Sequence, residues 1–361
     1  MEFIEEYRDK KIVGALAESI RKRSVHDIVL MEVCGGHTMA VHKFGIKELL
    51  PSTIRLLSGP GCPVCVSGTG FIDSAIRLAG IPGNIIATYG DLVRVPGSSS
   101  TLEKERAEGA DIRVVYSVLD SIRIAHENPD HHIVFLGIGF ETTAPATAAA
   151  ILKARTEGLT NFSVLSSHKI MPPVMESLID EGVKIDGYIA PGHVSAITGV
   201  EMYRNIAEKY RMGVVVSGFE PVDILQTILM LVSQFEDHDP KVEIQYRRVV
   251  KPKGNPIARE LIGKVFITGD DWWRGIGMIP GSGLKIRPEF SSYDAERRFD
   301  LPHIPNKEPA GCICGEVLKG LKTPLDCGLF SAICTPVQPV GACMVSAEGT
   351  CATYYRYRKT A

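Results

Sequence analysis

The 361-residue chain lacks several features that would place it in a common class of protein. Its formal charge of -2 at pH 7 provides no excess of positive charge to attract a nucleic acid or an anionic membrane. No apolar run approaches the roughly 18 residues that a membrane-spanning helix needs, and the N-terminus has no basic segment followed by an apolar one. We therefore expect a cytoplasmic protein that binds neither nucleic acid nor a membrane.

Nucleotide-binding motifs are missing as well. The segment Ser98–Thr101 precedes a helical stretch, but no Walker glycine-lysine pattern accompanies it. No Gly-x-Gly-x-x-Gly stands between a predicted strand and a predicted helix. Motifs thus give little support for nucleotide binding.

Cysteine is absent from residues 66 to 311, and this gap divides the nine cysteines into two groups. Three lie within the first 65 residues and six lie between 312 and 351. In a cytoplasmic protein, such cysteines indicate metal or redox chemistry more than a disulfide framework. The distribution predicts two separate chemical centres.

The first centre combines two short motifs that each follow a predicted buried strand. Cys34 and His37 follow the apolar run 28–33, and Cys62 and Cys65 follow the run 54–57. A Cys-x-x-Cys motif in this setting is typical of a redox dithiol or half of a metal site. The plainer alternatives are buried structural cysteines and a structural His37.

Apolar runs alternate with helical stretches over most of the chain, which predicts an α/β fold with mainly parallel sheets covered on both faces. We predict two Rossmann-like α/β domains and a loop-rich C-terminal iron-sulfur domain. The predicted divisions are an N-terminal helix packing on the body (1–24), a first α/β domain with both cysteine motifs (25–155), a second α/β domain (156–245) and the C-terminal domain (246–361).

Polar residues follow several of the predicted strands, where open α/β sheets bind their ligands. Glu141 and Glu220 each come directly after an apolar run and a phenylalanine, so each carboxylate must be paired or functional. His193 and Asp223 occupy similar positions, although Asp223 is also placed to cap a helix. Together these residues predict a cleft.

The second centre contains six cysteines within 40 residues, two more than one zinc ion or one cubane cluster uses. The two close Cys-x-x-Cys knuckles common in zinc sites are missing. Wide spacing favours an iron-sulfur cluster, and a structural zinc site stays an alternative. The residues alone do not say which four cysteines are ligands.

Taken together, these motifs resemble those of the HypD family of nickel-iron hydrogenase maturation proteins. The matching segments span residues 31 to 351 and include Met31–Thr38, Gly59–Cys65, Tyr89–Asp91, Arg94–Gly97, Gly139–Pro145, Pro191–Ser195 and the C-terminal cysteines. One departure is Met39, where many members have a second histidine.

The resemblance implies a scaffold on which an iron centre with two cyanides and one carbon monoxide is assembled. The iron would be held by Cys34 and a thiolate of a HypC-type chaperone, and cyanide would come from a HypE-type donor. His37 would ligate or move a proton. Cys62 and Cys65 would be a redox pair, and Glu141, His193, Glu220 and Asp223 would be cleft residues. Soft thiolate ligands suit such an iron.

The family's cluster pattern, carried over to this chain, assigns Cys312, Cys327, Cys334 and Cys351 to a 4Fe-4S cluster. Cys314 and Cys343 would then form a second redox pair, similar to the dithiol beside the cluster of ferredoxin-thioredoxin reductase. Electrons would pass from the cluster through this pair to Cys62 and Cys65.

Two alternatives remain open at this point. The first is an iron-sulfur thiol-disulfide reductase that acts on a protein partner and does not need Cys34. The second is a zinc protein in which Cys34, His37, Cys62 and Cys65 form one structural site. We expect a monomer in a transient complex, and the sequence leaves open whether the complex hydrolyses ATP.

Overall fold

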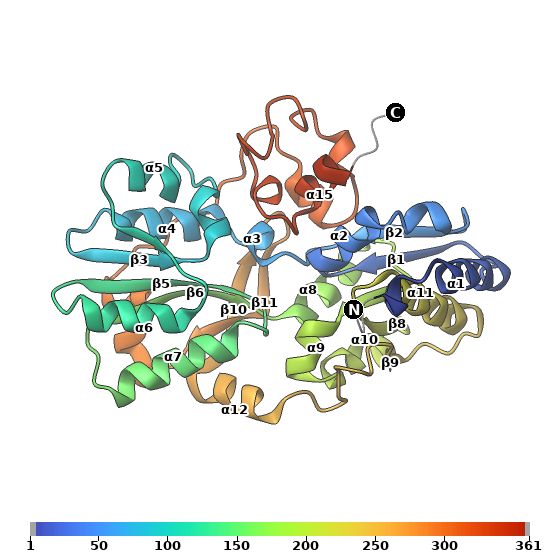
Figure 1. Cartoon of the computed structure of the whole chain (residues 1–361), viewed down its shortest axis with the longest axis horizontal. Coiled ribbons are helices and arrows are strands. Elements are labelled where there is room, and N and C mark those ends of the chain that lie inside the picture. The colour runs from blue at the N-terminus through green and yellow to red at the C-terminus, as the bar shows by residue number, and fades with distance from the viewer. Residues whose placement is uncertain (1–4, 358–361) are drawn as a thin grey trace.

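The computed structural model describes residues 5–357 and contains two β-sheets with helices on their faces. Figure 1 shows one sheet on each side of the molecule, with the C-terminal segment lying between them at the top. Both sheets are dominated by parallel pairs. The predicted class, two Rossmann-like α/β units, is confirmed.

Sheet A has five parallel strands, and the two cysteine motifs of the N-terminal region follow two of them. The three central strands are buried along their whole length, as expected for a sheet covered on both faces. Their order is β2 (Ile54–Ser58), β1 (Ile28–Glu32), β7 (Gly187–Pro191), β8 (Gly213–Ser217) and β9 (Val242–Ile244).

Helices cover both faces of sheet A. On one face Leu30, Ile189 and Val215 pack with α1 (Lys10–Arg23), α2 (Gly35–Lys43) and α11 (Pro221–Glu236). On the other face lie α8 (Met171–Asp180) and α10 (Arg204–Lys209). The predicted N-terminal helix corresponds to α1, which packs on α11, and residues 1–4 of that prediction lie outside the described residues.

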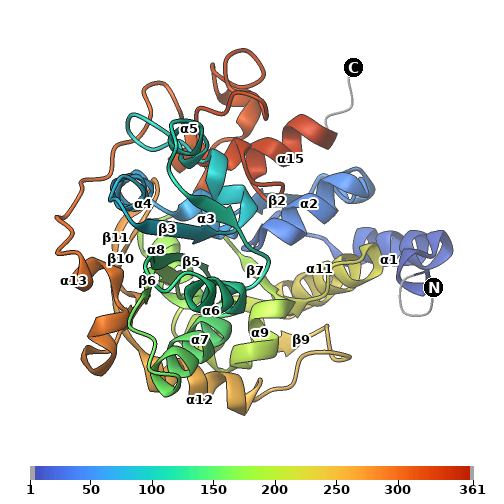
Figure 2. The ribbon, with the colours of Figure 1, turned by 60° about the vertical axis from the view of Figure 1, so that its left-hand side comes forward.

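Sheet B has six strands, in the order β10 (Phe266–Trp273), β11 (Gly277–Ile286), β6 (Phe162–Lys169), β5 (His132–Gly139), β3 (Asn84–Thr88) and β4 (Ile112–Val114). One face packs against α6 (Val118–Glu127), α7 (Ala144–Thr156) and α12 (Pro256–Val265), and the other against α4 (Thr69–Ala79) and α5 (Leu102–Ala107). Figure 2 shows α6 and α7 stacked beside β5.

The two sheets do not follow the predicted consecutive domains 25–155 and 156–245. Strands β1 and β2 pair with β7 and β8 in sheet A, whereas β3, β4 and β5 pair with β6 in sheet B. Each sheet is therefore built from both predicted domains. Apolar runs identify strands, but tertiary packing selects the partner with which each strand pairs.

The predicted C-terminal domain, residues 246–361, also differs from the structure. Helix α12 and the hairpin β10–β11 belong to sheet B, where β11 pairs antiparallel with β6. This hairpin is rich in glycine, and Gly275, Gly277 and Gly281 have positive φ angles. The glycines that suggested a loop therefore shape the turn and the irregular register of a hairpin.

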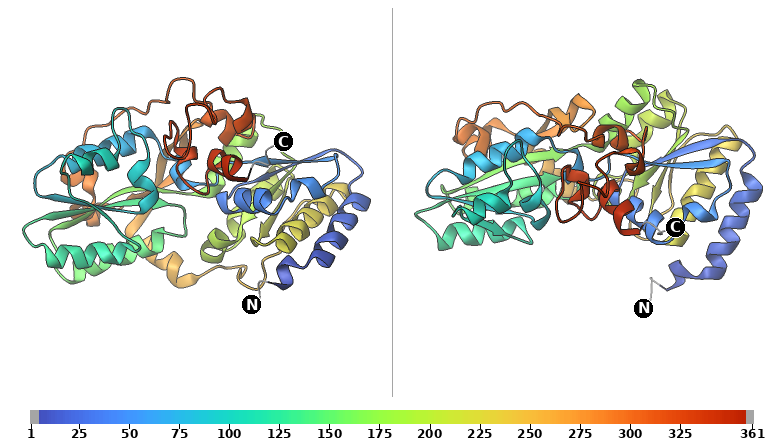
Figure 3. Two further views of the ribbon diagram at one scale, coloured as in Figure 1. Left: turned by 45° about the horizontal axis from the view of Figure 1, so that its top comes forward. Right: turned by 90° about the horizontal axis from the view of Figure 1, so that it is seen from above.

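The remaining C-terminal segment is rich in loops and fills the space between the two sheets (Figure 3). Its short helices are α14 (Cys314–Leu318) and α15 (Thr350–Tyr357), with 3₁₀ turns η6 (Pro324–Asp326) and η7 (Ala342–Met344), whereas α13 (Ala295–Arg298) packs against β6 of sheet B. Helix α15 packs against α2. No helix within residues 5–357 has the length and apolarity that crossing a membrane requires.

The other short elements are α3 (Pro63–Val66), α9 (Gly192–Thr198), η1 (Glu6–Arg8), η2 (Lys47–Leu49), η3 (Gly90–Arg94), η4 (Glu201–Tyr203) and η5 (Pro288–Tyr293).

Candidate functional site

Cys34 lies at the point where β1 ends and α2 begins. Its backbone is extended and it precedes the first helical residue, Gly35. The amide of Gly35 donates to the carbonyl of Gly61 at 3.0 Å, which joins the Cys34 turn to the Cys-x-x-Cys turn. A β-carbon on Gly61 would stand 2.1 Å from the Cys34 nitrogen, so glycine is required for this approach.

The Cys34 thiol is 2% exposed, and its Sγ lies 3.9 Å from Nδ1 of His193. Burial, helped by the carboxyl group of Glu348, raises the pKa of Cys34 above its ordinary value. His193 follows β7, and its side chain is exposed, so the thiol is reached from the side of His193. Sheet A therefore brings together two of the predicted site residues.

His37, which the resemblance would have ligate iron or move a proton, lies in an enclosed position. Its ring is fully buried and stacks on Phe219 with 4.7 Å between ring centroids, and Nε2 donates to the Gly218 carbonyl at 2.9 Å. Burial and the nearby His193 lower its pKa to about 4, so the ring is neutral at pH 7. Its Nδ1 has no hydrogen-bond partner. His193, rather than His37, is the imidazole hydrogen-bonded to the Cys34 sulfur.

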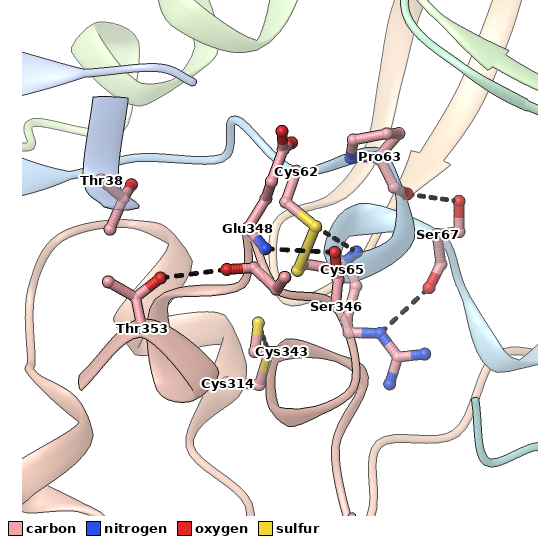
Figure 4. The surroundings of a disulfide bond; sticks show 12 residues. Thr38, Cys62, Pro63, Cys65, Ser67, Cys314, Cys343, Ser346, Glu348 and Thr353 are labelled. Atoms are coloured by element: carbon pink, nitrogen blue, oxygen red, sulfur yellow. Dashed lines mark hydrogen bonds between the residues drawn. A yellow bond between two sulfur atoms is a disulfide. The ribbon is translucent and has the colours of Figure 1, made fainter. Parts of the chain in front are cut away.

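Cys62 and Cys65 form a disulfide at the start of the single-turn helix α3 (Figure 4). Pro63 occupies the first helical position, where its fixed φ is compatible with a helix, and the amide of Cys65 points at the Cys62 sulfur at 3.3 Å. Both residues are buried. The predicted redox pair is thus brought within bonding distance by local structure.

Cys314 and Cys343 also form a close pair, with 2.8 Å between their sulfurs. Both are buried, and they come from α14 and η7. Helix α3 packs against η7, and Figure 4 shows Cys314 and Cys343 together next to the Cys62–Cys65 disulfide. Two cysteine pairs that are far apart in the sequence therefore lie side by side.

All six C-terminal cysteines line one mostly apolar cavity. Leu329, Phe330 and Met344 contribute its apolar wall, and the amide of Val340 points at the Cys334 sulfur at 3.3 Å. A β-carbon on Gly341 would stand 3.0 Å from the Cys312 sulfur. The four cysteines carried over from the resemblance are among the lining residues: Cys312, Cys327, Cys334 and Cys351.

No group of three or more His, Cys, Asp or Glu side chains among the described residues could hold a single metal ion. The geometry therefore does not support the alternative Cys3His zinc site, since two of its four ligands are joined in a disulfide. Four of the thiols that line the shared cavity are the number of ligands that a 4Fe-4S cluster uses.

The predicted cleft carboxylates mainly have structural partners. Glu220 caps α11 and pairs with Arg8. Asp223 is fully buried, and both of its oxygens accept from Arg248, at 2.7 and 2.6 Å.

Glu141 differs from these two. One of its oxygens accepts from the Met171 amide at the start of α8, and the other has no partner. Burial raises its pKa to about 7. This carboxyl group can therefore exchange a proton near neutral pH.

Three charged residues near the cysteines were not predicted. Glu32 at the end of β1 is 2% exposed, accepts from Thr38 at 2.6 Å and has its pKa raised to about 8 by burial. Glu348 packs against Gly35 through its backbone and β-carbon. A carboxylate at the end of an apolar strand was the available signal for Glu32, whereas nothing in the local sequence indicated Glu348.

The third residue is Arg274, in the turn of the β10–β11 hairpin. Its side chain is 1% exposed and one of its terminal nitrogens, Nη2, has no partner. Hydrogen bonds from Cys312 and Cys343, together with the charge of Arg274, lower the pKa of Cys314. Only the tertiary fold brings this residue to the cysteines.

The fold and site define a two-sheet α/β protein in which a buried cysteine, a disulfide and a cysteine-rich cavity adjoin. Comparison with known proteins agrees with this class. The model of the family described as "HypD: Hydrogenase formation hypA family" matches residues 10–358, and the chain belongs to this HypD family.

Several curated proteins are similar over nearly the whole chain. The hydrogenase maturation factor HypD2 of Bradyrhizobium diazoefficiens is 46% identical over 99% of this chain and 97% of its own length. The hydrogenase maturation factors HypD of Rhizobium leguminosarum and Escherichia coli are 46% and 43% identical, each over 99% of this chain, and over 96% and 99% of their own lengths.

Proposed function

We propose that this chain acts in hydrogenase maturation as the scaffold on which an iron centre with two cyanides and one carbon monoxide is assembled. In this proposal the iron is cargo, held by the Cys34 thiolate and a thiolate of a HypC-type chaperone. Cyanide is delivered by a HypE-type donor. The family membership supports the general role, and the geometry of the cysteines supports the particular one.

The observation that carries the proposal is the contact between the Cys34 turn and the Cys62–Cys65 turn. The Gly35–Gly61 hydrogen bond joins the two turns, so a redox pair stands beside a single thiol that is not in a disulfide. A soft thiolate is a suitable ligand for iron that also binds cyanide and carbon monoxide. His193 beside Cys34 is placed to orient the thiol through Nδ1, and burial lowers the pKa of its ring to about 4, so the ring is neutral at pH 7.

The C-terminal cavity supports a resident 4Fe-4S cluster bound by Cys312, Cys327, Cys334 and Cys351. The donor set is four thiols in an apolar wall, and the Val340 amide directed at Cys334 is the kind of hydrogen bond that tunes such clusters. When bound, the cluster would supply single electrons to the adjacent cysteine pair.

The two cysteine pairs would then exchange oxidation states. A thiolate of the Cys314–Cys343 pair attacks the Cys62–Cys65 disulfide, which breaks as an inter-pair disulfide forms. The second thiolate of the attacking pair then attacks this inter-pair disulfide and releases the remaining cysteine of the Cys62–Cys65 pair as a thiolate. Cys314 and Cys343 end as a disulfide, and Cys62 and Cys65 end as a dithiol that has gained two electrons and two protons. The packing of α3 on η7 supports this direct route.

Infrared spectroscopy provides the test. The chain is produced together with a HypC-type chaperone and a HypE-type donor, purified without air, and examined for metal-bound cyanide and carbonyl bands beside a Cys34→Ala variant. We expect bands in the parent and none in the variant. A His26→Ala variant is the matched control, because the His26 side chain pairs with Glu236. This variant is expected to keep the bands.

The alternative function is an iron-sulfur thiol-disulfide reductase that acts on a protein partner. It shares the two cysteine pairs but gives Cys34 no role. If the parent shows no bands while Cys62 and Cys65 still cycle between disulfide and dithiol, the reductase replaces the scaffold. Iron and sulfide analysis of the parent and of Cys334→Ser, with loss of both expected in the variant, tests the cluster separately.

A further inference from the structure

The turn of the β10–β11 hairpin contacts the segments that carry the two cysteine pairs. The Arg274 amide donates to the Val66 carbonyl at 2.8 Å, and its Nε donates to the Ser67 carbonyl at 3.0 Å. These two carbonyls end helix α3, which carries Cys65. On the other side of the turn, a β-carbon on Gly275 would stand 2.0 Å from Cα of Gly315, the residue after Cys314. The turn is thus in backbone contact with both pairs' helices.

The buried guanidinium of Arg274 has only one weak ion pair and one nitrogen without a partner. The side chain is 1% exposed, and its nearest acid, Glu308, is 3.6 Å away and 39% exposed. One terminal nitrogen, Nη2, is buried without any partner. Desolvating an ion costs several kcal/mol, and a neutral side-chain donor could satisfy the Ser67 carbonyl without that cost. A buried cation at this place therefore suggests an anion that forms during the reaction.

We propose that Arg274 is a positioning residue for the Cys62–Cys65 pair: it ties the end of α3 to the Cys314 segment and its charge stabilises the thiolate that is released when the disulfide opens. Opening is the exchange described above, in which the Cys314–Cys343 dithiol supplies two electrons and two protons. The disulfide is neutral and gains nothing from the cation, whereas the reduced pair does. Against an external dithiol, which does not feel this charge, Arg274 therefore favours the reduced state of Cys62 and Cys65. This inference rests on the proposed redox role of the pair.

The test uses the full chain, purified without air, with the variants Arg274→Met and Arg274→Lys. Cleavage after Arg55 and Arg77 gives one peptide, residues 56–77, that contains Cys62 and Cys65 and no other cysteine. Alkylation of this peptide, followed by mass spectrometry, reports the pair alone. Two quantities are measured: the fraction reduced in dithiothreitol buffers, and the pH dependence of the alkylation rate after reduction.

We expect Arg274→Met to alkylate about tenfold more slowly at pH 7, with its rate profile moved about one unit toward higher pH. Its reduction equilibrium is expected to move about tenfold toward the disulfide, which corresponds to about 30 mV. Arg274→Lys keeps the charge and is expected to stay within about threefold of the parent. An unchanged pH profile in Arg274→Met, or equal losses in both variants, would overturn the proposal.

A second variant keeps the test valid if Arg274→Met does not fold, as judged by circular dichroism. Glu308→Gln leaves Arg274 in place and removes its compensating charge. We expect this variant to shift the rate profile toward lower pH, and no shift, or one toward higher pH, contradicts the role of the charge. The infrared bands are a separate readout. Loss of those bands in the parent refutes the scaffold, whereas a Cys62–Cys65 equilibrium unaffected by Arg274 refutes this inference alone.

Discussion

Replacing Gly61 by alanine is expected to separate the two turns that form the Cys34 site. The new β-carbon would lie 2.1 Å from the nitrogen of Cys34, 2.3 Å from its Cα and 2.4 Å from the Val33 carbonyl carbon. Ordinary contacts begin near 3.4 Å, so the chains must part by more than 1 Å. All three contacts are with backbone atoms, and no change of side-chain rotamer can relieve them.

The expected loss in the free energy of unfolding is large because backbone atoms cannot move aside as a side chain can. Overpacking a rigid site costs about 1–3 kcal/mol, and separation of the turns also breaks the Gly35–Gly61 hydrogen bond, worth about 1 kcal/mol. We therefore expect Gly61→Ala to lose about 2–4 kcal/mol in urea-induced unfolding and to lose the infrared bands that depend on Cys34.

Gly14→Ala is the matched control. Gly14 lies in α1 with no atom within 4 Å of the added β-carbon, so alanine is expected to increase stability by up to about 1 kcal/mol. If Gly61→Ala unfolds at the same urea concentration as the parent, or keeps its bands at full intensity, the close approach of the two turns is wrong.

Two further predictions concern the buried carboxylates. Asp223→Ala leaves the Arg248 guanidinium without its bidentate partner and is expected to lower the free energy of unfolding in urea by about 3 kcal/mol. In a double-mutant cycle, adding Arg248→Met should recover part of this loss. If the losses of the two single variants simply add, the ion pair does not contribute to stability. Burial raises the pKa of Glu141 from 4.5 to about 7, so the folded state holds this proton more tightly and stability falls as pH rises across that window. Glu141→Gln keeps the acceptor for the Met171 amide but carries no ionisable group. In urea unfolding we therefore expect this variant to be more stable than the parent at pH 8, by on the order of 2 kcal/mol, and equal to it near pH 4. A parent whose stability depends on pH no more than that of the variant would contradict the raised pKa.

Much of the fold could be predicted because buried strands leave a strong local signal. The runs that became β1, β5 and β8 are apolar and buried along almost their whole length. Strand partners could not be predicted in the same way. The register of β1 against both β2 and β7 joins residues 26 and 157 positions apart, and such pairing depends on helices that must cover each face.

The hairpin β10–β11 was missed because its sequence suggests a loop. Its strands carry Gly269, Gly277, Gly281 and Gly283, and only part of each strand is buried. Antiparallel pairing with β6 compensates for this weak local preference. The consequence extends to the site, since the turn of this hairpin carries Arg274.

The sequence by itself determined which residues are candidates for chemistry. Cys34, the Cys62–Cys65 pair and the six C-terminal cysteines are recognisable from residue type and local spacing, because a Cys-x-x-Cys turn places two sulfurs together whatever the rest of the chain does. Only the tertiary structure decided which of them are neighbours. Packing of α3 against η7, the contact of Gly35 with Gly61 and the burial of Arg274 all join segments distant in sequence. Such contacts form only when two sheets and the segment between them exclude water together, and no local pattern records that event.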